Sequence, residues 1–297
     1  MTMSGLNRRQ FLGAAAVAGA SLSASTRVSG ADEELKSIGR TPHTTFALHL
    51  ERWWTHLPFL ERIEKVAELG FPAVEFWPWT NKDVDAVAKK TKELGLVIAQ
   101  FSAWGFTPGL NNPKNHEAFV DAIEKSCEVA KRLDVQLMTV VAGDDQPGMT
   151  QAEMHQNVIA GLKMAAPIAE KNGVTMILEP MNIRVDHKGH CLYGSPPTIR
   201  ICEAVNSPAV KINWDLYHMQ ITEGDICGRM RDGWKHVGYL QLADHPGRFQ
   251  PGTGEIHYPR VLREAHDLGY RGYVGVECRP HTSETEAAKD VARADVW

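Results

Sequence analysis

The sequence lacks the features that several classes of protein require. Its five cysteines are odd in number, lie scattered along the chain and form no CxxC pair, which argues against a disulfide scaffold and a structural zinc site. Its net charge is only -4 at pH 7, and no basic stripe or polybasic patch offers a surface for nucleic acid or for a membrane. We therefore expect buried free thiols and a small-molecule ligand rather than a nucleic-acid partner.

The longest run of small apolar residues lies near the N-terminus and is too short to cross a membrane, because a spanning helix needs about 20 apolar residues. Arg8 and Arg9 precede this run, with Phe11 and Leu12 between them and the apolar residues. The order resembles a twin-arginine export signal. We predict an export signal at residues 1–31, a linker at 32–44 and an exported, periplasmic protein without stable membrane insertion. An ordinary basic tail is the alternative.

Short apolar runs alternate with amphipathic stretches over the rest of the chain. Candidate strands lie at residues 45–49, 73–77, 96–101, 136–142, 174–179, 209–215, 237–243 and 272–277. The clearest helical patterns lie at 57–69, 115–133, 150–171, 197–205 and 258–268. This alternation, with no break in composition, predicts one α/β domain over residues 45–297, a single (β/α)8 barrel or TIM barrel. A doubly wound open sheet is the alternative, but no glycine-rich phosphate loop follows the first strand.

Four of the expected strands end in a polar side chain. Glu179, Asp215, Gln241 and Glu277 end the fifth to eighth strands, and 36, 26 and 36 residues separate them in turn. Each interval fits one strand and one helix, and the parallel strands of a barrel end on the same rim. Two glutamates, an aspartate and an amide would be costly to bury together without a cation. We predict that all four bind one divalent metal.

Each of these residues also has a plainer structural interpretation. Glu179, Asp215 or Glu277 alone could form a salt bridge at the rim, and Gln241 could simply satisfy backbone groups. Other side chains could line the pocket or have no chemical role: His187, His190 and His245. A set of tryptophans after the early strands could wall the pocket or pack in the core: Trp53, Trp54, Trp77, Trp79 and Trp104.

The oxygen-rich ligand set suits Mg²⁺ or Mn²⁺ better than a metal that prefers thiolates. Such a metal can chelate adjacent oxygens of a hydroxy-ketone, acidify the neighbouring C–H group and stabilise an enediolate. Proton transfer then needs a base on one or both faces, and Glu179 and Glu277 are the candidates. His218, three residues after Asp215, could hydrogen-bond a substrate oxygen. Arg248 could hold a substrate carboxylate or hydroxyl through its planar fork.

Four stretches around these residues resemble the hydroxypyruvate isomerase family, within the xylose isomerase-like barrel superfamily. They are ILEPMN (177–182), WDLYHMQ (214–220), YLQLADHPGRFQPGTGEIHY (239–258) and VGVECRP (274–280). The resemblance covers nearly all of residues 45–282, including PFLERIEKVAELGFPAVEFWP (58–78). It implies a TIM barrel that isomerises hydroxypyruvate to tartronate semialdehyde, with Glu179 and Glu277 as the proton-transferring pair. Ketose 3-epimerases of the superfamily usually place histidine where Gln241 stands, which favours the isomerase branch.

Three functions therefore compete. The first is a metal-assisted aldose–ketose isomerase of a small hydroxy-keto acid, and the second is a ketose 3-epimerase or sugar dehydratase acting on a larger keto-sugar. The third is a non-catalytic sugar-acid-binding barrel. A DNA-repair nuclease of the superfamily is disfavoured, because that chemistry uses a histidine-rich multi-zinc cluster and a basic face. Barrels of this kind often form homo-oligomers, but no stripe in the sequence identifies an interface.

Overall fold

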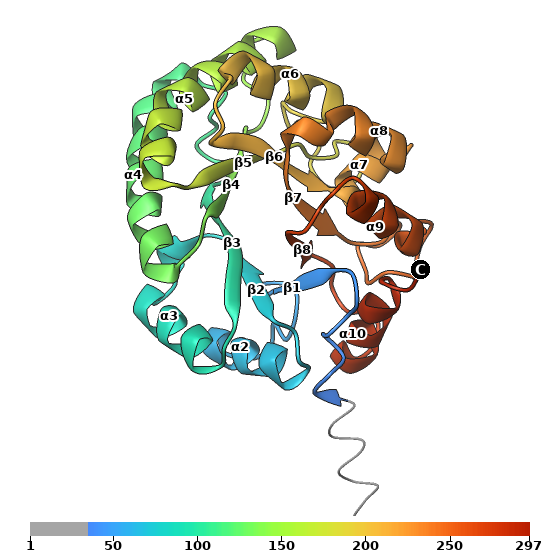
Figure 1. Ribbon diagram of the computed structural model, residues 1–297. Helices are drawn as coiled ribbons and strands as arrows, with labels where there is room; N and C mark the ends of the chain where they lie inside the picture. The colour runs from blue at the N-terminus through green and yellow to red at the C-terminus, as the bar shows by residue number, and fades with distance from the viewer. Residues whose placement is uncertain (1–34) are drawn as a thin grey trace, which may run out of the picture. The chain divides into compact units, whose positions relative to one another are not determined.

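Eight parallel strands close into a barrel in the computed structural model, which describes residues 35–297 (Figure 1). The strands pair in chain order, and the last strand pairs with the first to complete the ring. The predicted export signal at 1–31 and the first residues of the predicted linker lie outside the described residues. The strands are β1 (Thr45–His49), β2 (Ala73–Phe76), β3 (Val97–Trp104), β4 (Leu137–Val141), β5 (Thr175–Glu179), β6 (Val210–Asp215), β7 (Val237–Leu242) and β8 (Tyr273–Val276).

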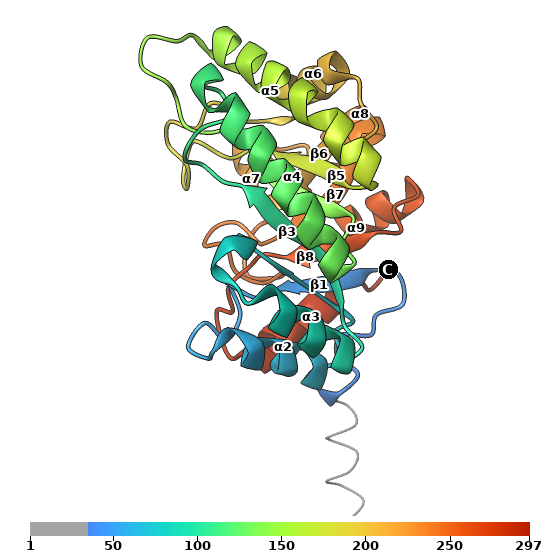
Figure 2. The same cartoon turned by 90° about the vertical axis from the view of Figure 1, so that its left-hand side faces the viewer.

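The closed ring confirms the predicted barrel and excludes the open sheet. Helices cover the outside of the ring, and α4 lies between α3 and α5 along one side (Figure 2). The helices are α2 (Phe59–Glu68), α3 (Val84–Glu93), α4 (His116–Leu133), α5 (Gln151–Asn172), α6 (Ser195–Val205), α7 (Leu216–Thr222), α8 (Ile226–Gly233), α9 (Tyr258–Asp267) and α10 (Glu284–Arg293). The largest difference from the expected strands is at β3, which continues to Trp104, beyond the expected end at residue 101; the other strand ends differ by at most one residue.

Local sequence signals explain where the elements begin and end. Helix α5 starts at a capping box, in which the Thr150 hydroxyl accepts from the backbone of Glu153 and the Glu153 carboxylate accepts from the backbone of Thr150. It ends at Gly173, whose φ of 66° is a left-handed conformation that costs glycine little. Helix α7 starts directly at the end of β6, where the Asp215 side chain accepts from the backbone N–H of Tyr217 at 2.8 Å. This short connection places His218 one turn beyond Asp215.

A hydrogen-bonded polar layer crosses the inside of the barrel below the rim. We call it the interior layer, and its members are Glu75, Gln100, Thr139, Asn213, Tyr239 and Gln241. Glu75 is its centre and accepts three hydrogen bonds, from Gln241 Nε2 (2.9 Å), Gln100 Nε2 (3.1 Å) and the Tyr239 hydroxyl (2.8 Å). Thr139 donates to Gln100 at 2.9 Å, and Asn213 donates to Gln241 at 2.6 Å. The layer therefore joins five strands through side chains.

The barrel makes room for this layer with small residues. Alanines at positions 47, 73 and 99 face the interior, and Gly275 on β8 lies beside the Glu75 carboxylate, where any Cβ would overlap it. Burial raises the pKa of Glu75 to about 8, although its hydrogen-bond donors oppose the shift. The centre of the layer is thus the buried carboxyl group of Glu75, which accepts hydrogen bonds from three donors on β3 and β7.

The described part of the predicted linker is attached to the barrel. The backbone N–H of Gly39 donates to Leu69 at 2.9 Å, and the Thr44 hydroxyl donates to Asp295 Oδ1 at 2.6 Å. The backbone of His43 adds a bond to the other oxygen of Asp295 at 2.7 Å. Within residues 35–297, none of the helices combines the length and the apolar character that a membrane crossing requires.

Candidate active site

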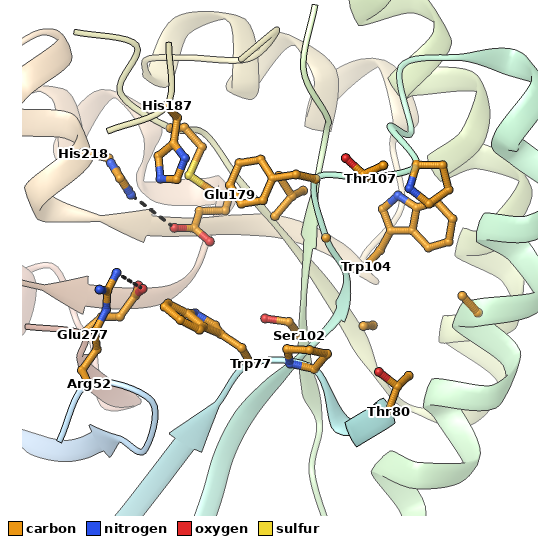
Figure 3. A pocket seen from close by; sticks show the side chains of 18 of the residues that line it. Arg52, Trp77, Thr80, Ser102, Trp104, Thr107, Glu179, His187, His218 and Glu277 are labelled. Atoms are coloured by element: carbon orange, nitrogen blue, oxygen red, sulfur yellow. Dashed lines mark ion pairs between the residues drawn. The ribbon is translucent and has the colours of Figure 1, made fainter. Parts of the chain in front are cut away.

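The carboxyl ends of the strands surround a cavity of about 600 Å³ (Figure 3). One side of this cavity, which we call the charged half, is formed by Arg52, Glu179, His187, His218, Arg248 and Glu277. The other side, which we call the aromatic half, is formed mainly by Trp77, Ser102, Trp104, Phe106, Thr107 and Pro108. The predicted site residues therefore meet at one rim, and the longer β3 supplies much of the opposite wall.

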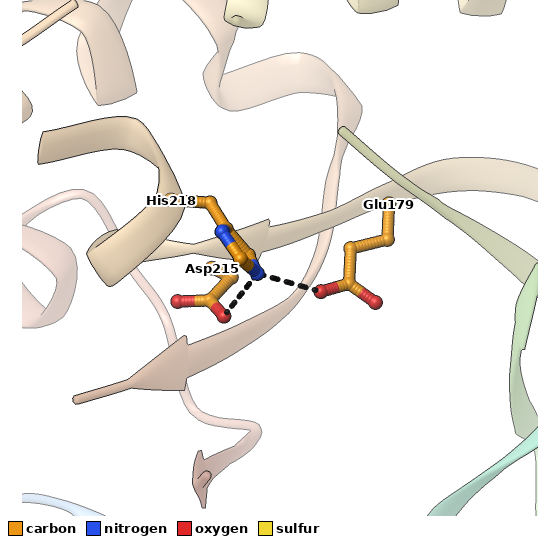
Figure 4. Close-up of side chains that lie close together, drawn as sticks. All are labelled: Glu179, Asp215 and His218. Carbon is orange, nitrogen blue, oxygen red and sulfur yellow. Dashed lines mark ion pairs between the residues drawn. The ribbon is translucent and has the colours of Figure 1, made fainter. Parts of the chain in front are cut away.

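Two carboxylates and a histidine lie together at the ends of β5 and β6 (Figure 4). His218 Nε2 is 3.5 Å from Asp215 Oδ2 and 3.8 Å from Glu179 Oε1. One donor atom from each of the three residues lies within 4.8 Å of the others, and all three side chains are buried. This is the spacing of groups that can share one ligand, and it brings together residues that are 36 positions apart in the chain.

Arg248 occupies the space between the carboxylates. Its Nη2 donates to Glu277 Oε1 at 2.9 Å and lies 3.7 Å from Asp215 Oδ2. The loop that carries Arg248 is held by Asp244, whose carboxylate accepts from the backbone N–H groups of Gly252 (2.9 Å) and Ile256 (3.0 Å), among others. Asp244 therefore orients the loop and fixes the place from which Arg248 reaches the site.

The carboxyl groups have pKa values displaced in opposite directions. Burial, followed by the negative charges of Glu277 and Asp215, holds the pKa of Glu179 well above its ordinary value. Burial also raises the pKa of Asp215 to about 7, although the charge of Arg248 opposes the shift. Burial acts on Glu277 in the same direction, but the charge of Arg248 and those of other nearby cations outweigh it and lower the pKa of Glu277. One glutamate thus favours the protonated form and the other the ionised form.

Asn182 sets the tautomer of His218. The Asn182 side-chain oxygen accepts from the backbone N–H groups of Val185 (3.0 Å) and Asp186 (3.2 Å), so its NH₂ group must face His218. That group lies 2.7 Å from His218 Nδ1, and the backbone N–H of Asn182 donates to the same atom at 3.3 Å. Burial lowers the pKa of His218 well below its ordinary value. The neutral ring therefore accepts at Nδ1 and carries its proton on Nε2.

The tautomer makes His218 a donor into the cavity. A 3.4 Å contact joins its Nε2 to Nη2 of Arg248, which is also a donor. The shorter contact at Nδ1 decides the proton's position, so the contact with Arg248 brings two donors together. Two donors this close favour an acceptor placed between them, and a substrate oxygen supplies one. This arrangement agrees with the predicted substrate-binding roles of His218 and Arg248, which stay predictions.

The donor set fits a divalent cation. Asp215 is only 1% exposed, and its Oδ2 has no hydrogen-bond partner in the part of the chain that the structure describes. Buried carboxylates in mutual repulsion, as shown by the raised pKa of Glu179, are stabilised by a cation between them. Because Nε2 of His218 carries the proton, the oxygens of Glu179 and Asp215 are the donors of this group that suit a metal. Glu277 lies outside the group and accepts a hydrogen bond from Arg248, so its metal-binding role stays a prediction.

Gln241, the fourth predicted ligand, belongs to the interior layer by its contacts. Its Nε2 donates to Glu75, and its Oε1 accepts from Asn213. An amide oxygen has two lone pairs, so Oε1 can accept from Asn213 and still offer an oxygen lone pair to a metal. The metal-binding role of Gln241 stays a prediction.

Arg52 is a site residue that the sequence pattern did not reveal. It follows β1 in the loop, its Nη2 lies 3.6 Å from Glu277 Oε1, and its guanidinium stacks over Trp77 at 4.7 Å from the ring centroid. The fully buried His49, at the end of β1, contacts the edge of the same ring at 4.8 Å. A cation directly after the first strand, beside two tryptophans, was the available signal, and it lacked the regular spacing that identified the other residues.

The remaining aromatic and histidine candidates divide between the cavity and the core. Trp77, Trp104 and His187 line the cavity, and His187 stacks on Phe106 at 4.8 Å. The other tryptophans pack in or against the core: Trp53, Trp54 and Trp79. His190 and His245 are absent from the lining of this cavity, so both have a different structural context from His218.

The chain has relatives among known proteins that match it over most of its length. The model of the xylose isomerase-like TIM barrel family matches residues 63–295. The chain belongs to this family. Hydroxypyruvate isomerase of Escherichia coli is 29% identical over 248 residues, covering 82% of this chain and 95% of the relative. The 2-oxo-tetronate isomerase of Cupriavidus necator is 32% identical over 242 residues, covering 79% of this chain and 92% of the relative. These relatives confirm the resemblance to the hydroxypyruvate isomerase family.

A solved structure gives the same fold under a different name. The crystal structure of AP endonuclease, family 2, from Brucella melitensis matches with a TM-score of 0.78 and 27% identity, covering 82% of this chain and 96% of that chain. The nuclease name belongs to that protein. Within residues 35–297 of this chain, the grouped metal-type donors are the two carboxylates and one histidine at Glu179, Asp215 and His218.

Proposed function

We propose that this protein is a metal-dependent isomerase of small 2-keto-3-hydroxy acids, and that hydroxypyruvate is converted to tartronate semialdehyde. The observation that carries the proposal is that Glu179 and Glu277 line one cavity together with the donors His218 and Arg248. Two carboxyl groups in one pocket are suited to act as acid and base, and in the metal-free protein their pKa values are displaced in opposite directions. The named activities of the two isomerase relatives point to the same reaction class.

The reaction moves a carbonyl group by one carbon. A proton leaves C3 and a proton arrives at C2, while the hydroxyl proton passes from the oxygen on C3 to the oxygen on C2. Glu277, kept ionised by Arg248, accepts the proton from C3. Glu179, which burial biases towards the protonated form, returns a proton to C2. Atoms and electrons balance without any second reactant.

The other rim residues hold and polarise the substrate. Mg²⁺ or Mn²⁺ bound by Glu179, Asp215, Glu277 and the predicted ligand Gln241 would supply positive charge that polarises the carbonyl group. His218 presents its Nε2–H to a substrate oxygen and stays neutral because its pKa is low. Arg248 offers a second donor 3.4 Å away. Together they stabilise negative charge on adjacent substrate oxygens as the proton leaves.

The direct test supplies hydroxypyruvate and Mg²⁺ or Mn²⁺ to the purified protein and follows tartronate semialdehyde. We expect turnover that disappears with EDTA and returns with the metal. Saturable metal binding without any turnover would contradict this substrate. Full activity in Glu179→Gln would instead favour the non-catalytic reading of the barrel, with a contaminant as the source of the turnover.

Epimerisation at C3 of a longer ketose is the second candidate. The same two glutamates would remove and return a proton at one carbon, and a cavity of about 600 Å³ accepts a longer substrate. Deuterium from solvent would then enter C3 and the configuration there would change. Formation of a product whose carbonyl group has moved would count against it.

A further inference from the structure

The cavity is much larger than the substrate that the isomerase relatives suggest. Its volume is about 600 Å³. A three-carbon keto acid occupies on the order of 100 Å³, judged from the roughly 30 Å³ that a water molecule takes up in the liquid. The two glutamates proposed to transfer the proton and the donors His218 and Arg248 all lie in the charged half. The aromatic half is therefore space for a part of the substrate that does not react.

In the charged half, the Arg52 side chain donates no hydrogen bond to another described residue, whereas Arg248 donates one to Glu277. Arg248 is bound to Glu277 at 2.9 Å, whereas Arg52 approaches the same carboxylate only to 3.6 Å. The buried Nε of Arg52 has no hydrogen-bond partner among the described residues. Stacking on Trp77 holds the plane of the guanidinium in place. A planar fork held in this way, at the wall of a cavity, fits a carboxylate that accepts two hydrogen bonds.

The aromatic half has the surface of a site for sugar carbons. Trp77, Trp104 and Phe106 supply apolar faces, and Ser102 and Thr107 supply hydroxyl groups on the same half. Figure 3 shows Ser102 near Trp77 and Thr107 near Trp104. The C–H faces of a hydroxylated chain pack on aromatic rings, while its hydroxyls need hydrogen-bond partners such as these. No charged side chain lies on this half of the lining. It therefore suits the neutral, hydroxyl-bearing end of a substrate rather than a second acid group.

We propose that the substrate class is a 2-keto sugar acid of five or six carbons. Its carboxylate binds Arg52, C2 and C3 lie between Glu179 and Glu277, and the remaining hydroxyl-bearing carbons lie against the aromatic half. This proposal rests on the proposed isomerase chemistry and adds the groups that select the substrate. The proton still passes from C3 to C2, so the chemistry is unchanged and only the unreactive end of the substrate is longer.

Three probes separate the two parts of this proposal. 2-Keto-D-gluconate has six carbons and a carboxylate, D-fructose has the same length with a CH₂OH group in place of the carboxylate, and hydroxypyruvate has the carboxylate but only three carbons. Exchange of the C3 proton for solvent deuterium is measured by NMR with Mg²⁺-loaded protein. We expect kcat/KM for 2-keto-D-gluconate to exceed that of each other probe by at least about tenfold, because binding of the remote part assists the reaction.

Two variants assign the preference to residues. Arg52→Gln should lower kcat/KM for both acids by about tenfold to a hundredfold, the effect of losing a hydrogen bond to a charged group, and should lower it less for D-fructose. Phe106→Ala, in a loop, should lower the value for 2-keto-D-gluconate by about three- to tenfold and affect hydroxypyruvate less. Trp104→Phe should give a smaller loss of the same kind while it keeps the ring contact with Phe119.

The outcomes distinguish this proposal from the isomerase chemistry on which it rests. Exchange with hydroxypyruvate that equals or exceeds exchange with 2-keto-D-gluconate would overturn the longer substrate and leave the isomerase standing. The carboxylate role of Arg52 would be overturned by a kcat/KM for D-fructose equal to that for 2-keto-D-gluconate. It would also be overturned if Arg52→Gln lowered kcat/KM equally for all three probes. Absence of exchange with every probe, from protein that binds Mg²⁺, would overturn the isomerase and this proposal together.

Discussion

The barrel contains two buried polar regions that differ in one respect. In the interior layer, Glu75 accepts three hydrogen bonds, and its donors Gln100 and Gln241 accept bonds in turn from Thr139 and Asn213. At the rim, Asp215 Oδ2 lacks a partner among residues 35–297, and two donors, on His218 and Arg248, face each other. Most polar groups of the first region are paired inside the protein, and Asn213 Oδ1 is its one atom without a partner among the described residues. The second is left incomplete, and a metal and a substrate would complete it.

Gln241 connects the two regions. Glu75 holds its NH₂ group and Asn213 contacts its oxygen, so its amide orientation is set from below the rim. A ligand supported in this way keeps its position when the metal leaves. The comparison therefore predicts that rim substitutions reduce activity while they preserve or increase stability, and that interior substitutions reduce stability first.

The largest effect is expected at the rim. Glu179→Gln removes a proton-transferring group and should lower kcat by about 10³-fold. It also removes a buried carboxyl group whose ionised form is disfavoured in the folded protein, so the Tm of the metal-free protein at neutral pH should rise. Steady-state kinetics measures kcat and calorimetry measures Tm. The control is Glu255→Gln, which makes the same substitution at an exposed position. A fall in both activity and Tm would show that the rim carboxylate supports the fold.

The next effect concerns the tautomer of His218. Asn182→Asp replaces a donor at Nδ1 by an acceptor, so the ring proton should move to Nδ1 and the ring should lose its donor in the cavity. We expect kcat to fall by about tenfold to a hundredfold, as for other groups that orient a site residue. The ¹⁵N shifts of the His218 ring report the tautomer directly. Unchanged shifts would refute the role of Asn182, whatever the activity does.

The interior layer should show the opposite pattern. Gln100→Met keeps the approximate shape but removes one donor to Glu75 and the acceptor of Thr139. The free energy of unfolding should fall by about 2 kcal/mol, the cost of leaving buried groups unpaired, with kcat within a factor of about three. Denaturant titration measures the free energy of unfolding, and steady-state kinetics measures kcat. A loss of activity larger than the loss of stability would mean that the interior layer acts in the reaction.

The smallest effect is a pH dependence in the metal-free protein. Because the pKa of Asp215 is raised to about 7 from an ordinary value of 3.8, the folded protein keeps a proton that the unfolded chain releases. This contribution to stability is present below pH 4 and is lost as the pH rises towards 7. The Tm advantage of Asp215→Asn over the wild type should therefore widen by about 3 °C or more between pH 4 and pH 7. A constant difference would contradict the raised pKa.

Regular features of the molecule could be predicted from the sequence, and irregular contacts could not. Strand periodicity and spacing located Glu179, Asp215 and Glu277, because the first two end a strand, Glu277 directly follows one, and every strand ends on the same rim. Glu75 stands in a short apolar strand, and its bond to Gln241 spans 166 positions, which no local pattern encodes. Arg52 lies in a loop after β1, where its contacts depend on packing. Export, metal identity and oligomeric state stay predictions.

The central claim is that the rim carboxylates share one cation, and titration of Mn²⁺ into EDTA-treated protein tests it most directly. Isothermal calorimetry should show one ion per chain, with affinity reduced by about a hundredfold or more in Asp215→Asn and nearly unchanged in Gln100→Met. Absence of saturable binding, or equal affinity in the wild type and Asp215→Asn, would contradict the account.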